Sequence, residues 1–130
     1  MSSPSWGAVL KYIIDAVSDE LNGVLIYTDR PAADTTASKY LVLSLLDINP
    51  EYTLGGHSYY TATVRVISVA KEGAVAALEL LDTVQGVLAG TTADINGDEV
   101  QFVYQSTRQV EVEDGWVYQS EYKIFYIQGS

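Results

Sequence analysis

The sequence contains no cysteine, a single histidine and only seven lysines and arginines among its 130 residues. The absence of cysteine excludes disulfides, thiolate nucleophiles and zinc–thiolate sites. A DNA-binding surface is excluded as well, because it needs clustered cations, whereas those of this chain are scattered from Lys11 to Lys123. No run approaches the roughly 20 apolar residues of a membrane-spanning helix. The first residues lack a basic leader and a small-residue cleavage site, so we expect no signal peptide.

Acidic residues and tyrosines are what the sequence has in excess. Its 17 aspartates and glutamates give a net charge of −10, and ten residues are tyrosines. Such a charge favours solubility, and it also suits a surface that repels nucleic acid. A chain of this length fits a single domain over residues 1–130, which is large enough to bury roughly two thirds of its unfolded surface.

The strongest pattern lies between Glu72 and Gly90, where apolar residues recur every three or four positions and predict a helix. Its apolar stripe comprises Ala74, Ala77, Leu78, Leu81, Val84 and Leu88. Glu72 stands in the predicted first turn, and Gly90 supplies a left-handed stop. A similar stripe predicts a helix from Pro4 to Leu21, with Ser3 as its cap.

Five segments have the β-rich composition or the alternation of strands. They are Val24–Tyr27, Tyr40–Asp47, Ser58–Ala70, Glu99–Val112 and Trp116–Ile127. Thr28–Lys39 is predicted to be a polar loop, Asn49–His57 a loop or an irregular hairpin tip, and Ala93–Asp98 a turn. A tight turn at Glu113-Asp114-Gly115 would join the last two strands.

The element order predicts an α+β domain, in which a mostly antiparallel sheet of four or five strands has both amphipathic helices packed on one face. Within Glu99–Val112, Phe102 and Tyr104 alternate with polar residues that include Thr107. The last two strands are too long for two helices to cover. We therefore expect their far ends, near Thr107–Val117, to protrude as a C-terminal hairpin or to pair with another chain.

No group of residues points to an active site. His57 lies beside Ser58, but neighbouring residues of an extended segment point apart, so a solvated loop histidine explains it better. Asp94–Asp98 begins like a calcium loop, yet its glycine comes one place early and Gln105 stands where a bidentate glutamate is required. The glycines fit neither a phosphate loop nor a dinucleotide fingerprint. We expect no enzyme, no metal and no cofactor.

The order of the elements resembles that of a known family. An amphipathic helix is followed by GVLIYTD, a polar connection, YLVLSL and YYTATVRVIS, then by a second helix and a pair of strands ending in WVYQSEYKIFYI. Over nearly its whole length the chain resembles the tail-terminator and tail-to-head joining (tail completion) proteins of tailed bacteriophages. The resemblance is one of element order, size and composition, and no diagnostic motif carries it.

This resemblance implies a structural virion protein of the tail or neck, assembled in the host cytoplasm and away from membranes. Copies would form a ring, commonly of six, that caps the tail tube, joins it to the head connector and leaves a lumen for DNA. Carboxylates around that lumen would repel DNA within a Debye length of about 8 Å. The expected lumen acids, on the predicted hairpin, are Glu111, Glu113 and Asp114.

Two surfaces suit contacts within and between such rings, because tyrosine is favoured at protein–protein interfaces. The expected interface between copies comprises Tyr40, Val42, Tyr118, Tyr122 and Tyr126. The expected docking loop comprises Asn49, Tyr52, Leu54 and His57. Three arginines, Arg30, Arg65 and Arg108, either bridge copies through carboxylates or form ordinary surface pairs.

Two other interpretations remain open. A small-ligand-binding α+β domain would have a closed apolar pocket between its sheet and its helices. Another neck or minor tail component would share the size and the element order of a terminator.

Overall fold

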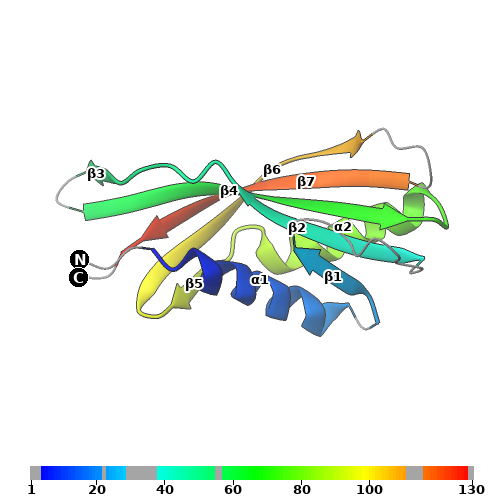
Figure 1. The fold of residues 1–130 in the computed structure, drawn as a ribbon, viewed down its shortest axis with the longest axis horizontal. Helices are drawn as coiled ribbons and strands as arrows, with labels where there is room; N and C mark the ends of the chain where they lie inside the picture. The colour runs from blue at the N-terminus through cyan, green and yellow to red at the C-terminus, as the bar shows by residue number, and fades with distance from the viewer. Residues whose placement is uncertain (1–3, 22, 29–37, 55–56, 111–115, 129–130) are drawn as a thin grey trace.

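The computed structural model describes residues 4–21, 23–28, 38–54, 57–110 and 116–128, with the backbone alone for Leu54, His57 and Trp116. Two helices and seven strands lie in these ranges (Figure 1). In chain order they are α1 (Trp6–Glu20), β1 (Leu25–Thr28), β2 (Lys39–Leu46), β3 (Tyr52–Leu54), β4 (His57–Ala70), α2 (Ala74–Leu88), β5 (Thr92–Ile95), β6 (Asp98–Val110) and β7 (Trp116–Ile127). Within the described ranges no helix has the length and apolar character to cross a membrane.

All seven strands belong to one sheet, in the spatial order β1-β2-β4-β7-β6-β5, with β3 paired to β4. The pair β1–β2 is parallel, and the other pairs are antiparallel. The predicted α+β class and both helices are confirmed. The sheet is mixed and larger than the four or five strands expected. The additional strands, β3 and β5, lie in segments expected to be a loop and a turn.

The turn between β5 and β6 shows why the incomplete calcium motif is structural. Asn96 and Gly97 both have positive φ angles, 56° and 88°. The Asp94 Oδ1 atom accepts a hydrogen bond of 3.0 Å from the Gly97 amide. Asn-Gly is the dipeptide that favours a two-residue hairpin turn of this kind. The motif therefore closes a hairpin, with β5 on one side and β6 on the other.

Both helices lie on one face of the sheet and share a single core with it, as expected (Figure 1). The buried residues of α1 are Val9, Ile13 and Val17, and those of α2 are Ala77, Leu80, Leu81, Val84 and Leu88. Alternate strand residues enter this core, as Val100 and Phe102 do in β6. The remaining strand residues lie on the opposite side of the sheet, which we call the helix-free face.

The helix boundaries differ slightly from those expected. Helix α1 begins at Trp6 after Ser5, whose side chain makes no capping hydrogen bond, and the predicted cap Ser3 lies outside the described residues. Glu72 precedes α2 instead of standing in its first turn, and its Oε1 atom accepts a 3.4 Å hydrogen bond from the Ser38 hydroxyl. Gly90, with φ +70°, supplies the predicted left-handed stop.

The expected protrusion of the C-terminal hairpin is wrong for the residues that the structure describes. Strand β7 is paired with β4 along its whole length, from Ile127 opposite Tyr59 to Trp116 opposite Ala70. The hairpin is thus built into the sheet, because β4 is as long as β7 and flanks it. The turn predicted at Glu113-Asp114-Gly115 lies outside the described residues.

A bulge in β6 changes which of its residues face the helices. The register with β7 shifts between Tyr104 and Ser106, so one extra residue reverses the alternation. Thr107, expected on the polar side, therefore lies on the same face as Tyr104. Its Oγ1 atom is 2.6 Å from the Tyr104 hydroxyl and 2.7 Å from the Ser120 hydroxyl. The hydroxyls of Tyr104, Thr107 and Ser120 thus form a short hydrogen-bonded network on the face that the helices cover.

Two valines of α2 test the orientation of this helix. Val84 is fully buried, whereas Val75 is 70% exposed. Val84→Ala should lower the free energy of unfolding by about 1.5–3 kcal/mol, because it removes buried methyl groups and leaves a cavity. Val75→Ala should change it by less than about 0.5 kcal/mol. Urea denaturation measures both values, and equal losses would contradict the packing of α2.

Candidate functional site

The described residues contain no arrangement typical of catalysis by metal ions. No three of their histidine and carboxylate side chains lie close enough to hold a metal ion. The backbone of His57 begins β4, opposite Leu54 of β3, and its side chain lies outside the description. The functional surfaces of this chain are therefore sought among its exposed apolar residues, its charges and the edges of its sheet.

Tyr122 and Tyr126 were expected at an interface between copies, and the structure places both in the core instead. Neither has any exposed surface, because this face of β7 meets the helices. The Trp6 ring at the start of α1 lies 5.4 Å from the Tyr126 ring. The alternation along β7 identifies correctly which residues share a face. It does not reveal that the tyrosine face is the one that the helices cover.

The hydroxyl of Tyr126 connects three segments of the chain. It donates a 2.5 Å hydrogen bond to the Asp98 Oδ2 atom at the start of β6. It also accepts a 3.3 Å hydrogen bond from the Ser5 amide, next to α1. Burial, reinforced by the hydrogen bond to Asp98, raises the pKa of Tyr126. The contact therefore fixes the beginning of α1 against the sheet.

The Tyr122 hydroxyl, in contrast, is buried without a hydrogen-bond partner among the described residues. Burial is also the main reason why the pKa of Tyr122 is raised, with Tyr104 a smaller cause. The Tyr104 ring packs edge-on against it at 5.6 Å. Tyr118, the third tyrosine of this face, is partly buried against the same core. Its role at an interface stays a prediction.

The two remaining interface residues lie on the helix-free face. Tyr40 is partly exposed, and its ring meets that of Tyr27 edge-on at 5.7 Å. Val42 is buried although no helix covers this side of the sheet. Its burial leaves Val42 little exposed surface, and its role at an interface between copies stays a prediction. Tyr40 stays a predicted contact residue.

The arginines find partners within the chain. The Nε and Nη2 atoms of Arg65 donate to the Glu121 Oε2 atom at 3.1 and 3.0 Å, across the β4–β7 pair. With the Gln119 side-chain amide oriented so that its oxygen faces Arg108, that oxygen accepts hydrogen bonds of 3.0 Å from both the Nε and the Nη2 atoms of Arg108. These contacts favour ordinary surface pairs over bridges between copies. Arg30 lies outside the described residues.

The expected docking loop is an arm at one end of the sheet, formed by residues 48–54 and 57–60 (Figure 1). The Asn49 amide and side chain both donate to Thr61, each at 2.9 Å, and this pins the base of the arm. The Tyr52 ring stacks on Tyr59 at 5.5 Å. Tyr52 is 48% exposed, and Ile48, which the sequence analysis overlooked, is 52% exposed. We call this feature the β3–β4 arm.

Some expected site residues lie outside the part of the chain that the structure describes. Glu111, Glu113 and Asp114, the expected lumen acids, lie outside the described residues. Sequence analysis also overlooked two exposed apolar residues of the strands, Leu25 and Val103. Val103 offered a signal, because it interrupts the alternation of β6 with an apolar residue at a polar position.

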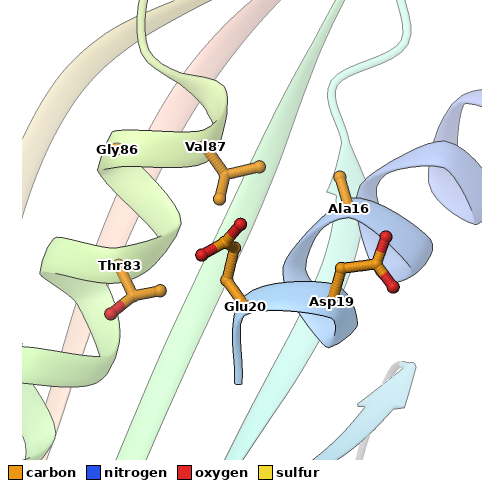
Figure 2. A pocket seen from close by; sticks show the side chains of 6 residues that line it. All are labelled: Ala16, Asp19, Glu20, Thr83, Gly86 and Val87. Atoms are coloured by element: carbon orange, nitrogen blue, oxygen red, sulfur yellow. The ribbon is translucent and has the colours of Figure 1, made fainter. Parts of the chain in front are cut away.

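Hollows in the surface do not have the character of a ligand pocket. One, of about 590 Å³, opens between the end of α1 and the C-terminal half of α2 and is lined by Ala16, Asp19, Glu20, Thr83, Gly86 and Val87. In Figure 2 the Glu20 carboxylate points toward α2, whereas that of Asp19 points away from it. A second hollow, of about 370 Å³, lies at the β5–β6 turn. Neither is the closed apolar pocket that the ligand-binding interpretation predicts.

Comparison with known proteins identifies a shared fold. No family model and no curated protein matches the chain. The fold is similar to that of a chain in the virion of a native gene transfer agent particle, with a TM-score of 0.78, 12% identity, and coverage of 98% of this chain and 100% of that one. A second solved protein, whose name states no function, aligns with a TM-score of 0.65, 10% identity, and coverage of 95% and 93%.

The two buried tyrosine hydroxyls should differ in their effect on stability. Tyr126→Phe removes a hydrogen bond to a charged group and should lower the free energy of unfolding by about 1.5–3 kcal/mol. Tyr122→Phe removes a buried hydroxyl that has no described partner, so it should be neutral or stabilising. Urea denaturation of both variants measures the difference. A larger loss in Tyr122→Phe would contradict this assignment.

Proposed function

We propose that this protein is a structural component of a phage-like virion, which forms a ring at the end of the tail tube and joins the tube to the head connector. The observation that carries the proposal is the likeness of its fold to a chain of a gene transfer agent virion, which extends over 98% of one chain and 100% of the other.

The charge of the chain supports a ring through which DNA passes. A net charge of −10 repels the phosphate backbone, so DNA slides past such a lumen without binding to it. The proposed lumen acids remain Glu111, Glu113 and Asp114. In the sequence they lie between the last residue of β6 and the first residue of β7. In this proposal the ring holds about six copies, and no ligand, metal or membrane takes part.

The β3–β4 arm supports docking onto a neighbouring ring. It presents two exposed apolar side chains, Ile48 and Tyr52, on a backbone fixed by the hydrogen bonds of Asn49 to Thr61. Exposed apolar residues on a pinned projection are typical of anchors at protein–protein interfaces, because little conformational freedom is lost on binding. We assign this arm to contacts with the tail tube or the head connector.

The alternatives are weaker on the same observations. A small-ligand-binding domain needs a closed apolar pocket, and the hollows described above are open and partly acidic. Another neck or minor tail component is compatible with the same fold. It is distinguished by where the protein binds, since a terminator caps the open end of a tail tube and a different component binds elsewhere.

Light scattering and electron microscopy of the purified protein, alone and mixed with tail tubes from the same particle, test this proposal. We expect a closed ring of about six copies that appears at one end of each tube. Ile48→Asp should preserve the ring and weaken tube binding by at least tenfold, because it places a charge in an apolar contact. Val75→Asp, an exposed position on α2, is the matched control and should preserve both.

A protein that stays monomeric at high concentration and also in the presence of tubes would contradict the ring. Rings that decorate the sides of the tubes, or bind elsewhere in the particle, would contradict the terminator role and favour another neck component.

A further inference from the structure

Two edges of the sheet have no partner strand within the described part of the chain. At one edge, β1 pairs with β2, and no described strand pairs with its other side. At the other edge, β5 pairs only with the first residues of β6, from Asp98 to Gln101. Two backbone hydrogen bonds between Phe102 and residues 90–91 extend this cover by one residue. Beyond Phe102, the outer side of β6 has no described partner strand.

The register of the strands places these two edges at the same level of the sheet. Residues that lie in one row across the sheet are Leu25, Tyr40, Val69, Val117 and Val110. Three positions further along, the row consists of Thr28, Leu43, Val66, Ser120 and Thr107. The whole of β1 is therefore level with Thr107–Val110 of β6. This is the part of β6 that β5 leaves uncovered.

The directions of the strands also match. Strand β1 runs with β2, and the antiparallel pairs from β2 through β4 and β7 reverse the direction three times before β6. Strands β1 and β6 therefore run in opposite directions. If a second copy continues the sheet with the same face toward the helices, its β1 meets β6 as an antiparallel neighbour, which is the pairing that prevails elsewhere in this sheet.

Both edges have the composition of a contact between copies of an acidic protein. The segments 21–28 and 100–110 contain no aspartate or glutamate, although the chain has 17. Leu25 is 49% exposed, and its position in the alternation places it on the helix-free face. Acid-free edges bring two copies together where the repulsion between their charges is smallest.

The geometry points to a seam in which β1 of one copy adds to β6 of the next copy as an antiparallel strand. Leu25 then lies opposite Val110, and Tyr27 opposite Arg108, on the same face of the joined sheet. The seam satisfies backbone groups that a free sheet edge leaves to water. It rests on the ring proposed above, and it specifies which surfaces the copies use.

Such a contact repeats from copy to copy, and it gives a closed ring when the rotation between neighbouring copies leads back to the first copy. The two edges are different surfaces of one molecule, so the contact is head-to-tail, and each copy has one edge left for the next copy. The twist of the strands and the angle between neighbouring copies then determine how many copies the ring contains. A two-fold dimer, in contrast, would use the same edge twice and end the assembly.

Disulfide trapping tests the seam directly, because the chain has no cysteine of its own. Leu25→Cys combined with Val110→Cys places two thiols in directly opposed positions, where antiparallel strands allow a disulfide. Mild oxidation of the assembled double variant should give a ladder from dimers up to the full ring on a non-reducing gel. An equimolar mixture of the two single variants should stop at dimers. Leu25→Cys combined with Val103→Cys is the control out of register, and it should give no ladder.

The outcomes separate the seam from the ring. Rings of unmodified size without a ladder would overturn the seam and leave the proposed function standing. Crosslinking of Leu25→Cys to itself, or an equal ladder from the control pair, would also overturn the seam. A protein that is monomeric at every concentration would contradict both proposals. The melting temperature of each variant, within a few degrees of the unmodified protein, excludes misfolding as the cause.

Discussion

The burial of one face of the sheet beneath two helices is the constraint on which the rest of this structure depends. Apolar residues from α1, α2 and alternate positions of the strands form one continuous core. Tyr122, Tyr126 and Phe102 are among the largest side chains that it buries completely. Because both helices pack on this face, no described helix covers the opposite one, and the β3–β4 arm keeps Ile48 and Tyr52 exposed. The outer sides of β1 and of the second half of β6 have no partner strand among the described residues.

Sequence alone predicts the local features of this fold well. The stripes of both helices, the alternation in the long strands and the stop at Gly90 are local properties of the chain. The parallel direction of β1 and β2 was not predictable, since composition and alternation identify a strand but not the direction in which it pairs. The alternation along β7 showed which tyrosines share a face of the sheet, but it did not show that the helices cover this face. A single bulge beyond Tyr104 similarly reversed the orientation of Thr107.

The surface that we propose for contact between copies therefore differs from the one expected from the sequence. The tyrosine-rich face of β7 first suggested contact with other copies, and the structure buries it within the molecule. The proposed assembly rests on the fold shared with a chain of a gene transfer agent virion, together with two level, acid-free sheet edges. These edges could be recognised only once the register was known. The β3–β4 arm, with Ile48 and Tyr52 exposed, is the surface that we propose for contact with a neighbouring ring.

Hydrogen–deuterium exchange of the unmodified protein, measured as monomer at low concentration and as assembled ring, tests most directly whether the sheet continues from one copy to the next. The account predicts that those amides of β1 and of Thr107–Val110 that point away from β2 and β7 exchange quickly in the monomer and become at least tenfold slower in the ring. The amides of β4 and β7 should be protected in both states, because these strands are internal to the sheet. Protection that appears on the helices while both edges continue to exchange quickly would contradict the account.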